Sequence, residues 1–284
     1  MSARSAPPPA AKASELGTRI ASALALGAVA IGLTWMADAG PFWSRAYGLF
    51  WLAASGAIAF EWQRMVGGAR PFVRSLAAGL GLAVAASRLP AHPADALAAV
   101  ALAAAVVGPL AGRARAGWAA AGVLYAASPL VATLLLRFDW PYGFVAAFWL
   151  FAVVWATDTM AYFGGRLIGG PKLWPAVSPK KTWAGFLVGA ASGAAASALF
   201  APEPSRWRLD LALGLAASVA SQGGDLYESA IKRRFGVKDS GALIPGHGGV
   251  MDRLDGYLAA AAMIALVGVA RAGAGHAAAG WFQW

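Results

Sequence analysis

The amino-acid sequence predicts an all-α, polytopic integral membrane protein with about nine transmembrane helices. Of its 284 residues, 59% are hydrophobic and only 13% are charged, whereas a soluble domain has about 45–50% apolar and about 25% charged residues. The apolar residues recur in blocks of about 18–22, and each block is long enough as a helix to cross about 30 Å of hydrocarbon. Lipid offers no partner to a bare backbone, so these blocks must be helical. A soluble protein built from very apolar helices is the less favoured alternative.

The expected spans follow a short tail and fall into two regions. Residues 1–17 are rich in Pro, Ala and Ser, which predicts a flexible cytoplasmic tail. A signal peptide is disfavoured, because the start is too long and the apolar run too extended. N-terminal membrane helices are expected over 18–115, and a C-terminal membrane catalytic region over 116–284. The expected spans are 19–38, 46–63, 72–89, 94–111, 117–136, 143–163, 183–200, 209–224 and 254–271.

The distribution of basic residues predicts the sidedness of these spans. The net charge is +10, and with a cytoplasmic N-terminus most of the 23 Lys and Arg residues fall on the cytoplasmic side. The opposite side receives only Arg45, Arg88, Arg137, Arg206, Arg208 and Arg271. This bias follows the positive-inside rule and predicts a multi-pass protein of the cell (inner) membrane. It also places the two most polar loops, 164–182 and 225–253, on the cytoplasmic face.

Several classes of chemistry are excluded by what the sequence lacks. There is no cysteine, so disulfides, thiolate metal sites and a cysteine nucleophile are excluded. Neither GxxxxGK[ST] nor GxGxxG occurs, which removes kinase or ATPase interpretations based on those motifs. The basic residues are scattered between hydrophobic spans rather than gathered in one patch, so no nucleic-acid partner is expected.

One polar segment, 224–255, concentrates acidic groups at the predicted membrane surface. It holds five of the 13 acidic residues, namely Asp225, Glu228, Asp239, Asp252 and Asp255. If 225–234 is helical, Asp225, Glu228, Ser229 and Lys232 share one face. Carboxylates converging at a surface suit Mg²⁺, and the glycines of 246–249 allow close approach to phosphate. The alternative is an ordinary solvated loop, which explains the lysines and glycines less well.

A second polar segment, 158–189, begins with a carboxylate near the end of an apolar run. A carboxylate in an apolar environment costs free energy, so Asp158 is a functional candidate. The alternative is that its side chain reaches the interface or pairs with a lysine. Ser178-Pro-Lys-Lys-Thr182 then precedes a span, and Pro179 could begin the next helix. The positive helix end, two ammonium groups and two hydroxyls would then form an anion site. Lysines that serve topology alone are the alternative.

These residues resemble the signature of the bacterial-type phosphatidate cytidylyltransferases. The resemblance covers about 120–270, whereas the first 110 residues match only as a series of spans. It rests on Asp158-Thr-x-Ala161-Tyr162, Ser178-Pro-Lys-Lys-Thr-Trp183, Gly185, Ser229-x-x-Lys232-Arg233, Lys238-Asp239, Pro245, His247-Gly248-Gly249 and Asp252-Arg253-x-Asp255. Two positions depart from the family pattern, because Ala184 stands where an acidic residue is usual and Gly256 where Ser is frequent.

The resemblance implies a membrane enzyme, most simply a homodimer, that uses Mg²⁺ and CTP to convert phosphatidic acid to CDP-diacylglycerol. A second cation is left open, and no residue is assigned to the cytosine. The family's metal ligands would be Asp225 and Asp252. Catalytic roles are expected for Lys181, Lys232, Asp239, Arg253 and Asp255, and phosphate binding for Ser178, Lys180, Lys181, Thr182, Ser229, Lys238, His247, Gly248 and Gly249. Asp158 and Glu228 are further candidates.

Three other functions compete with this one. CDP-alcohol phosphotransferases also use aspartates and Mg²⁺, but their DG-x-x-AR pattern is missing. A lipid-alcohol kinase of related architecture is the second, and an anion transporter is the third. Transporters usually bind substrate near the middle of the membrane, whereas the polar residues here gather at one face.

Overall fold

The computed structural model describes the backbone of residues 9–89, 91–200, 206–244 and 248–284, and this part of the chain is almost entirely helical. The long helices are α1 (Pro9–Met36), α2 (Pro41–Val66), α3 (Pro71–Arg88), α4 (Pro93–Leu110), α5 (Ala116–Arg137), α6 (Gly143–Leu167), α7 (Trp183–Ala198), α8 (Trp207–Arg234) and α9 (Met251–Ala272). A short turn, η2 (Ala274–His276), and α10 (Ala277–Phe282) follow. Two short strands, β1 (Lys172–Trp174) and β2 (Ser178–Thr182), lie between α6 and α7.

Each of the nine expected apolar segments coincides with one long helix in the described residues. Among these residues, four helices are long and apolar enough to cross a membrane, namely α4, α5, α6 and α9. The others are shorter or carry more polar residues; α7, for example, has 16 residues. Helix α1 begins at Pro9, inside the segment predicted to be a flexible tail. Residues 1–8 of that tail lie outside the described part.

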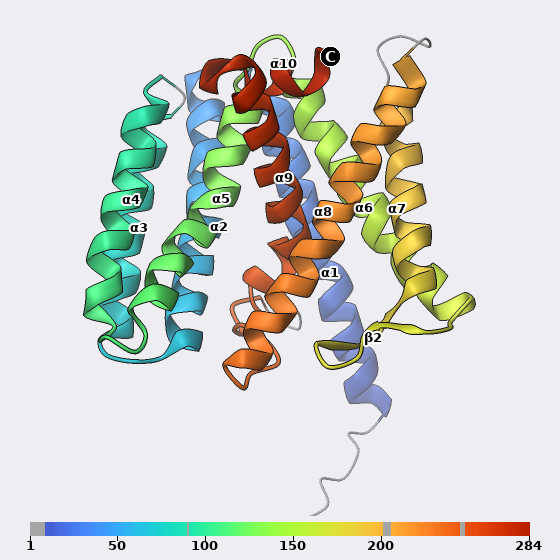
Figure 1. Ribbon diagram of the computed structural model, residues 1–284, viewed down its shortest axis with the longest axis horizontal. Helices are drawn as coiled ribbons and strands as arrows, with labels where there is room; N and C mark the ends of the chain where they lie inside the picture. Colours follow the sequence, from blue (N-terminus) through green and yellow to red (C-terminus); the bar gives the residue numbers. More distant parts are fainter. Residues whose placement is uncertain (1–8, 90, 201–205, 245–247) are drawn as a thin grey trace, which may run out of the picture.

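The long helices run between two common ends of the molecule (Figure 1). One end carries the β1–β2 hairpin and the α2–α3, α4–α5 and α8–α9 connections, and the other carries α10 and the C-terminus. The two most polar loops therefore lie at the same end, here called the hairpin end. Because the sequence predicted both loops on one face, this part of the expected topology agrees with the fold.

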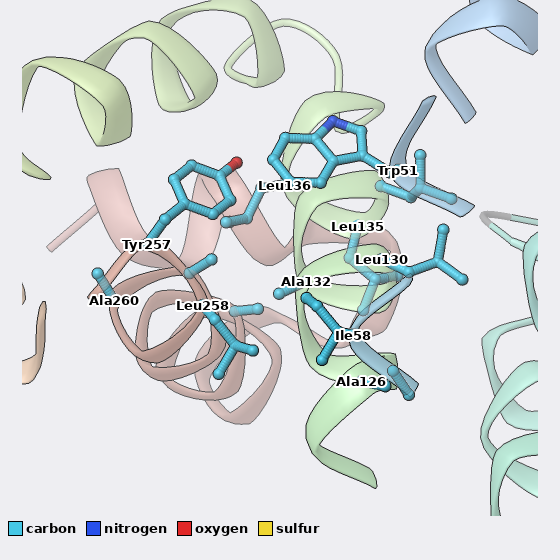
Figure 2. Packing of buried hydrophobic residues seen from close by; sticks show 14 of the residues in the cluster. Trp51, Ile58, Ala126, Leu130, Ala132, Leu135, Leu136, Tyr257, Leu258 and Ala260 are labelled. Carbon is cyan, nitrogen blue, oxygen red and sulfur yellow. The ribbon is translucent and has the colours of Figure 1, made fainter. Parts of the chain in front are cut away.

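Helices α2, α5 and α9 pack together through large apolar side chains (Figure 2). The rings of Trp51 on α2 and Tyr257 on α9 are stacked, with centroids 4.9 Å apart and planes 12° apart. The Tyr257 hydroxyl lies 3.1 Å from the Thr133 hydroxyl of α5, within hydrogen-bonding distance. Trp51, Ile58 and Leu130 are fully buried. This packing joins a helix of the N-terminal region directly to the predicted catalytic region.

Small residues bring α6, α7 and α8 into close contact. A Cβ on Gly193 of α7 would lie 1.9 Å from the Ser218 hydroxyl and 2.3 Å from the Thr157 hydroxyl. Those two hydroxyls are themselves hydrogen-bonded at 2.8 Å. Small residues let helix backbones approach and exchange polar contacts inside a membrane protein. The abundant glycine and alanine of the sequence therefore serve helix packing here.

The hairpin corrects the expectation of a purely helical chain. Strand β1 pairs with β2 in antiparallel fashion, with Lys172 opposite Thr182 and Trp174 opposite Ser178. Pro179 had been expected to begin a helix, but it lies within β2 instead. Helix α7 begins at Trp183 instead, and the Thr182 hydroxyl accepts a hydrogen bond from the Gly185 N–H at 3.1 Å. Thr182 is therefore the N-cap of α7.

Candidate active site

Acidic side chains from three helices meet a lysine of the hairpin at the hairpin end. The Lys181 ammonium group forms an ion pair with the Asp225 carboxylate of α8. Asp158 of α6 and Asp255 of α9 lie within electrostatic range of both groups and of each other. Three carboxyl groups thus lie near a single ammonium group, which cannot neutralise all of them when they are ionised. Such a cluster suits a hard cation with oxygen ligands.

The strand conformation separates the two lysines that were expected to converge. Successive side chains of a strand point to opposite faces. Lys181 accordingly reaches Asp225, whereas Lys180 is exposed to solvent. The Thr182 side chain is 4% exposed and caps α7, so it is placed for structure rather than for binding phosphate. The expected anion site of two lysines and two hydroxyls at a helix start is therefore wrong in its geometry.

Asp225, Glu228, Ser229 and Lys232 form the polar face of α8, as the sequence predicted. The Ser229 hydroxyl donates to Asp225 Oδ1 at 3.5 Å, one turn away. Glu228 Oε2 lies 2.6 Å from Lys232 Nζ, also one turn away. Glu228 is fully buried and Lys232 is 9% exposed. A buried carboxylate is tolerated when it is paired in this way.

A second network surrounds Asp252 in the first turn of α9. Lys232 Nζ lies 2.7 Å from Asp252 Oδ1, so this ammonium group serves both Glu228 and Asp252. The Ser240 N–H donates to the two Asp252 oxygens at 3.1 and 3.0 Å. The Gly249 N–H donates to Oδ2 at 2.9 Å. The Asp252 carboxylate therefore ties the α8–α9 connection to both helices, and Gly249 uses the N–H that had been expected to bind phosphate.

Glu61 of α2 joins this network and was missed by the sequence analysis. Glu61 is 2% exposed, and its carboxylate accepts hydrogen bonds from the Val250 and Met251 N–H groups, each at 2.9 Å. The Ser240 hydroxyl donates to it at 3.1 Å. The available signal was a lone carboxylate inside an apolar block, the same signal that selected Asp158.

Two glycines set the separation of α8 and α9 beside the acidic cluster. A Cβ on Gly224 would lie 2.4 Å from Ala259 Cβ and 2.5 Å from the Asp255 carbonyl oxygen. A Cβ on Gly256 would lie 2.6 Å from the Ser221 hydroxyl. The helices can therefore cross closely next to Asp225 and Asp255. The departure at Gly256 has a local reason, because a serine there would have to displace Ser221.

The remaining predicted residues lie around these two networks or outside the described part. Lys238, Asp239 and Arg253 are exposed, and Ser178 is half-buried on β2. Gly248 has a positive φ of 84°, and a Cβ there would lie 3.0 Å from Asp252 Oδ2. His247 lies outside the described residues. Ala184 is half-buried in the first turn of α7.

The donor chemistry at the hairpin end fits Mg²⁺, although no ready-made ligand set is present. Across the described ranges, no group of three or more His, Asp or Glu side chains is arranged so that it could hold a metal ion. Asp225 contacts Lys181 and Ser229, and the Asp252 oxygens face three N–H donors. Carboxylate oxygens are nevertheless the ligands that Mg²⁺ takes together with water and phosphate.

The chain belongs to the cytidylyltransferase family, whose model matches residues 17–270. The match extends through the N-terminal helices, beyond the part in which the sequence motifs had been found. It makes the protein a nucleotidyltransferase and removes the transporter alternative.

Phosphatidate cytidylyltransferases of two bacteria are similar to this chain. That of Brucella abortus (strain 2308) is 42% identical over 264 residues, which cover 90% of this chain and 94% of the relative. That of Bacillus subtilis (strain 168) is 44% identical over 120 residues, which cover 41% of this chain and 45% of the relative.

Proposed function

We infer that the chain transfers CMP from CTP to phosphatidic acid, giving CDP-diacylglycerol and pyrophosphate in phospholipid biosynthesis. The observation that carries this function is the meeting of Asp158, Lys181, Asp225 and Asp255 at one end of an apolar helix bundle. A lipid phosphate and a soluble nucleotide must react at a membrane surface. Membership of the cytidylyltransferase family indicates that the transferred group is CMP.

The reaction joins two anions and therefore needs alignment and charge neutralisation more than a strong base. A phosphatidate oxygen, already anionic at neutral pH, attacks the α-phosphorus of CTP, and the bond to pyrophosphate breaks. Lys181, at the edge of the acidic cluster, is proposed to bind a phosphate oxygen. Lys232 holds Glu228 and Asp252 in place. The exposed Lys238 and Arg253 are proposed to stabilise the charge that develops on pyrophosphate.

We also propose Mg²⁺ as the cofactor, with Asp225 and Asp252 as its protein ligands. Bound there, the ion would neutralise phosphate charge and orient the α-phosphate. Asp225 would exchange Lys181 for the ion, which frees that ammonium group for phosphate. When ionised, Asp158 and Asp255 add negative charge beside Asp225 and thereby favour a divalent ion. Asp239 stays a candidate for orienting the lysines.

The placement in the membrane is part of the same proposal. We propose that all nine long helices span the inner membrane, with the hairpin end facing the cytoplasm where CTP is available. The basic residues at that end support this orientation. A homodimer is proposed from the family resemblance, and light scattering of the detergent-solubilised protein tests it.

One assay tests the function directly. Detergent-purified protein is given CTP, phosphatidic acid and Mg²⁺ together, then with each omitted in turn, and pyrophosphate and CDP-diacylglycerol are measured. Formation of both products only when all three are present is the expected result. Folded protein that releases no pyrophosphate in lipid with Mg²⁺ would overturn the proposed reaction.

A further inference from the structure

We propose that Glu61 of α2 is a positioning residue, whose carboxylate fixes the start of α9 and thereby the orientation of Asp252. The inference rests on the proposed cytidylyl transfer, because that reaction gives Asp252 its role. It adds a residue of the N-terminal helices to a site that the sequence motifs place wholly in the C-terminal region. Glu61 contacts no substrate position in this proposal and acts through the backbone of the α8–α9 connection.

The first argument is the supply of acceptors at the beginning of α9. The first N–H groups of a helix have no partner within the helix and must find one elsewhere. Here the Gly249 N–H donates to Asp252, and the Val250 and Met251 N–H groups donate to Glu61. Two carboxylates thus satisfy three successive backbone donors, and negative charge is favourable at this helix end. Without Glu61, two of the three donors lose their partners.

Ser240 connects the two carboxylates. Its N–H donates to both Asp252 oxygens, and its hydroxyl donates to Glu61 Oε2 at 3.1 Å. Gly241 and Gly249 leave the room that this arrangement needs, because a Cβ on either would lie 2.6 Å from a Glu61 carboxylate oxygen. The connection is therefore shaped around the Glu61 side chain on one side and around Asp252 on the other.

The second argument is that α2 is a rigid support. The Trp62 indole N–H donates to the Trp118 carbonyl, and the Gln63 amide donates to the Ala119 carbonyl, each at 2.8 Å. Trp51 stacks on Tyr257 farther along α2. These contacts fix α2 against α5 and α9, so Glu61 has little freedom to follow a displaced loop. At 2% exposure it also leaves little space for a water molecule to replace it.

Gln63 offers a matched comparison on the same helix. It is fully buried and hydrogen-bonded, as Glu61 is, but its partner lies on α5 rather than in the α8–α9 connection. Variants of Glu61 and Gln63 therefore separate a general loss of stability from the loss of contacts to the α8–α9 connection. Loss of the hydrogen bonds of either side chain destabilises the protein, but only loss of the Glu61 carboxylate removes the contacts to Ser240, Val250 and Met251.

The experiment compares Glu61→Gln, Glu61→Asp, Ser240→Ala and Gln63→Leu with the wild type in detergent. Hydrogen exchange of peptides covering 240–251 is measured without substrates, and kcat and KM for CTP are measured at fixed phosphatidic acid and Mg²⁺. Glu61→Gln puts amide hydrogens against backbone donors. It should speed exchange in 240–251 about 10-fold and lower kcat/KM for CTP about 10-fold or more. Ser240→Ala should change exchange and kcat/KM in the same directions but less. Glu61→Asp keeps the carboxylate and should therefore lie between Glu61→Gln and the wild type in both readouts.

Gln63→Leu should lower the melting temperature while exchange in 240–251 and kcat/KM stay within about twofold of the wild type. Equal behaviour of Glu61→Gln and Gln63→Leu in both readouts would overturn the positioning role. If Glu61→Gln does not fold, unchanged exchange and kinetics in Ser240→Ala would overturn it instead. A wild-type protein that makes no CDP-diacylglycerol contradicts the proposed function, whereas the exchange data still decide whether Glu61 holds the segment.

Discussion

Lys181 of β2 and Asp225 of α8 form an ion pair that joins the hairpin to the acidic cluster. The Lys181 side chain is 26% exposed and that of Asp225 is 38% exposed, so both remain accessible from the hairpin end. The neighbouring Lys180 is exposed on β2. Two adjacent lysines of identical chemistry therefore occupy different positions relative to the site.

Lys181→Ala should lower kcat/KM for CTP about 10-fold or more, because a charge-assisted contact to phosphate is lost. Lys180→Ala serves as the matched control and should change kcat/KM by less than about threefold, since that ammonium group has no partner in the cluster. Steady-state kinetics with varied CTP measures both. Equal losses in the two variants would mean that the lysines act only as general positive charge.

Lys232 neutralises two carboxylates, and its removal should strongly destabilise the fold. Lys232→Met leaves Glu228 and Asp252 without their ammonium partner, which costs about 3–5 kcal/mol for a buried pair. Adding Glu228→Gln to this variant removes one of the two unpaired charges. The double variant should therefore melt at a higher temperature than Lys232→Met, as followed by thermal unfolding in detergent. A double variant that melts lower would show that Glu228 is stabilised by other groups.

Gly224 and Gly223 provide a test of the α8–α9 approach. Gly224→Ala places a methyl group against Ala259 and the Asp255 carbonyl, and overpacking of this kind costs about 1–3 kcal/mol. The helices must separate, so activity should fall together with the melting temperature. A Cβ on Gly223 meets nothing within 4 Å. Gly223→Ala should therefore leave activity unchanged and raise the melting temperature slightly, because alanine favours the helix.

The fold was predictable to the extent that apolar block length decides it. Helices such as α5 and α6 follow from runs of apolar residues that need no information from the rest of the chain. The β1–β2 hairpin does not, because pairing of Lys172 with Thr182 depends on the chain returning across a short loop. The role of Thr182 as a helix cap follows from that pairing. Local reasoning about Pro179 chose a helix start, and the strand pairing decided otherwise.

The site was predictable where chemistry follows spacing along one helix. Asp225, Ser229 and Lys232 were expected on one face of α8, and the structure places them there. Glu61 could not be connected with Ser240, because 179 positions of sequence separate them. Only the packing of α2 against α5 and α9 brings this carboxylate to the beginning of α9.

Asp252 is the residue whose replacement should separate folding from chemistry most sharply. Asp252→Asn retains the shape of the side chain but turns an amide group toward one of the N–H donors of Ser240 and Gly249. It also removes the charge that faces Lys232 and the proposed Mg²⁺. We expect a loss of about 1–3 kcal/mol in stability for an unsatisfied donor. The rate of CDP-diacylglycerol formation should fall at least about 1,000-fold, and excess Mg²⁺ should not restore it.

The control for the loss of charge is Asp95→Asn, which changes an exposed carboxylate of α4 and should match the wild type in both assays. Near-normal turnover by folded Asp252→Asn would leave this carboxylate with the structural role alone and would move the proposed metal site to Asp225 and its neighbours Asp158 and Asp255.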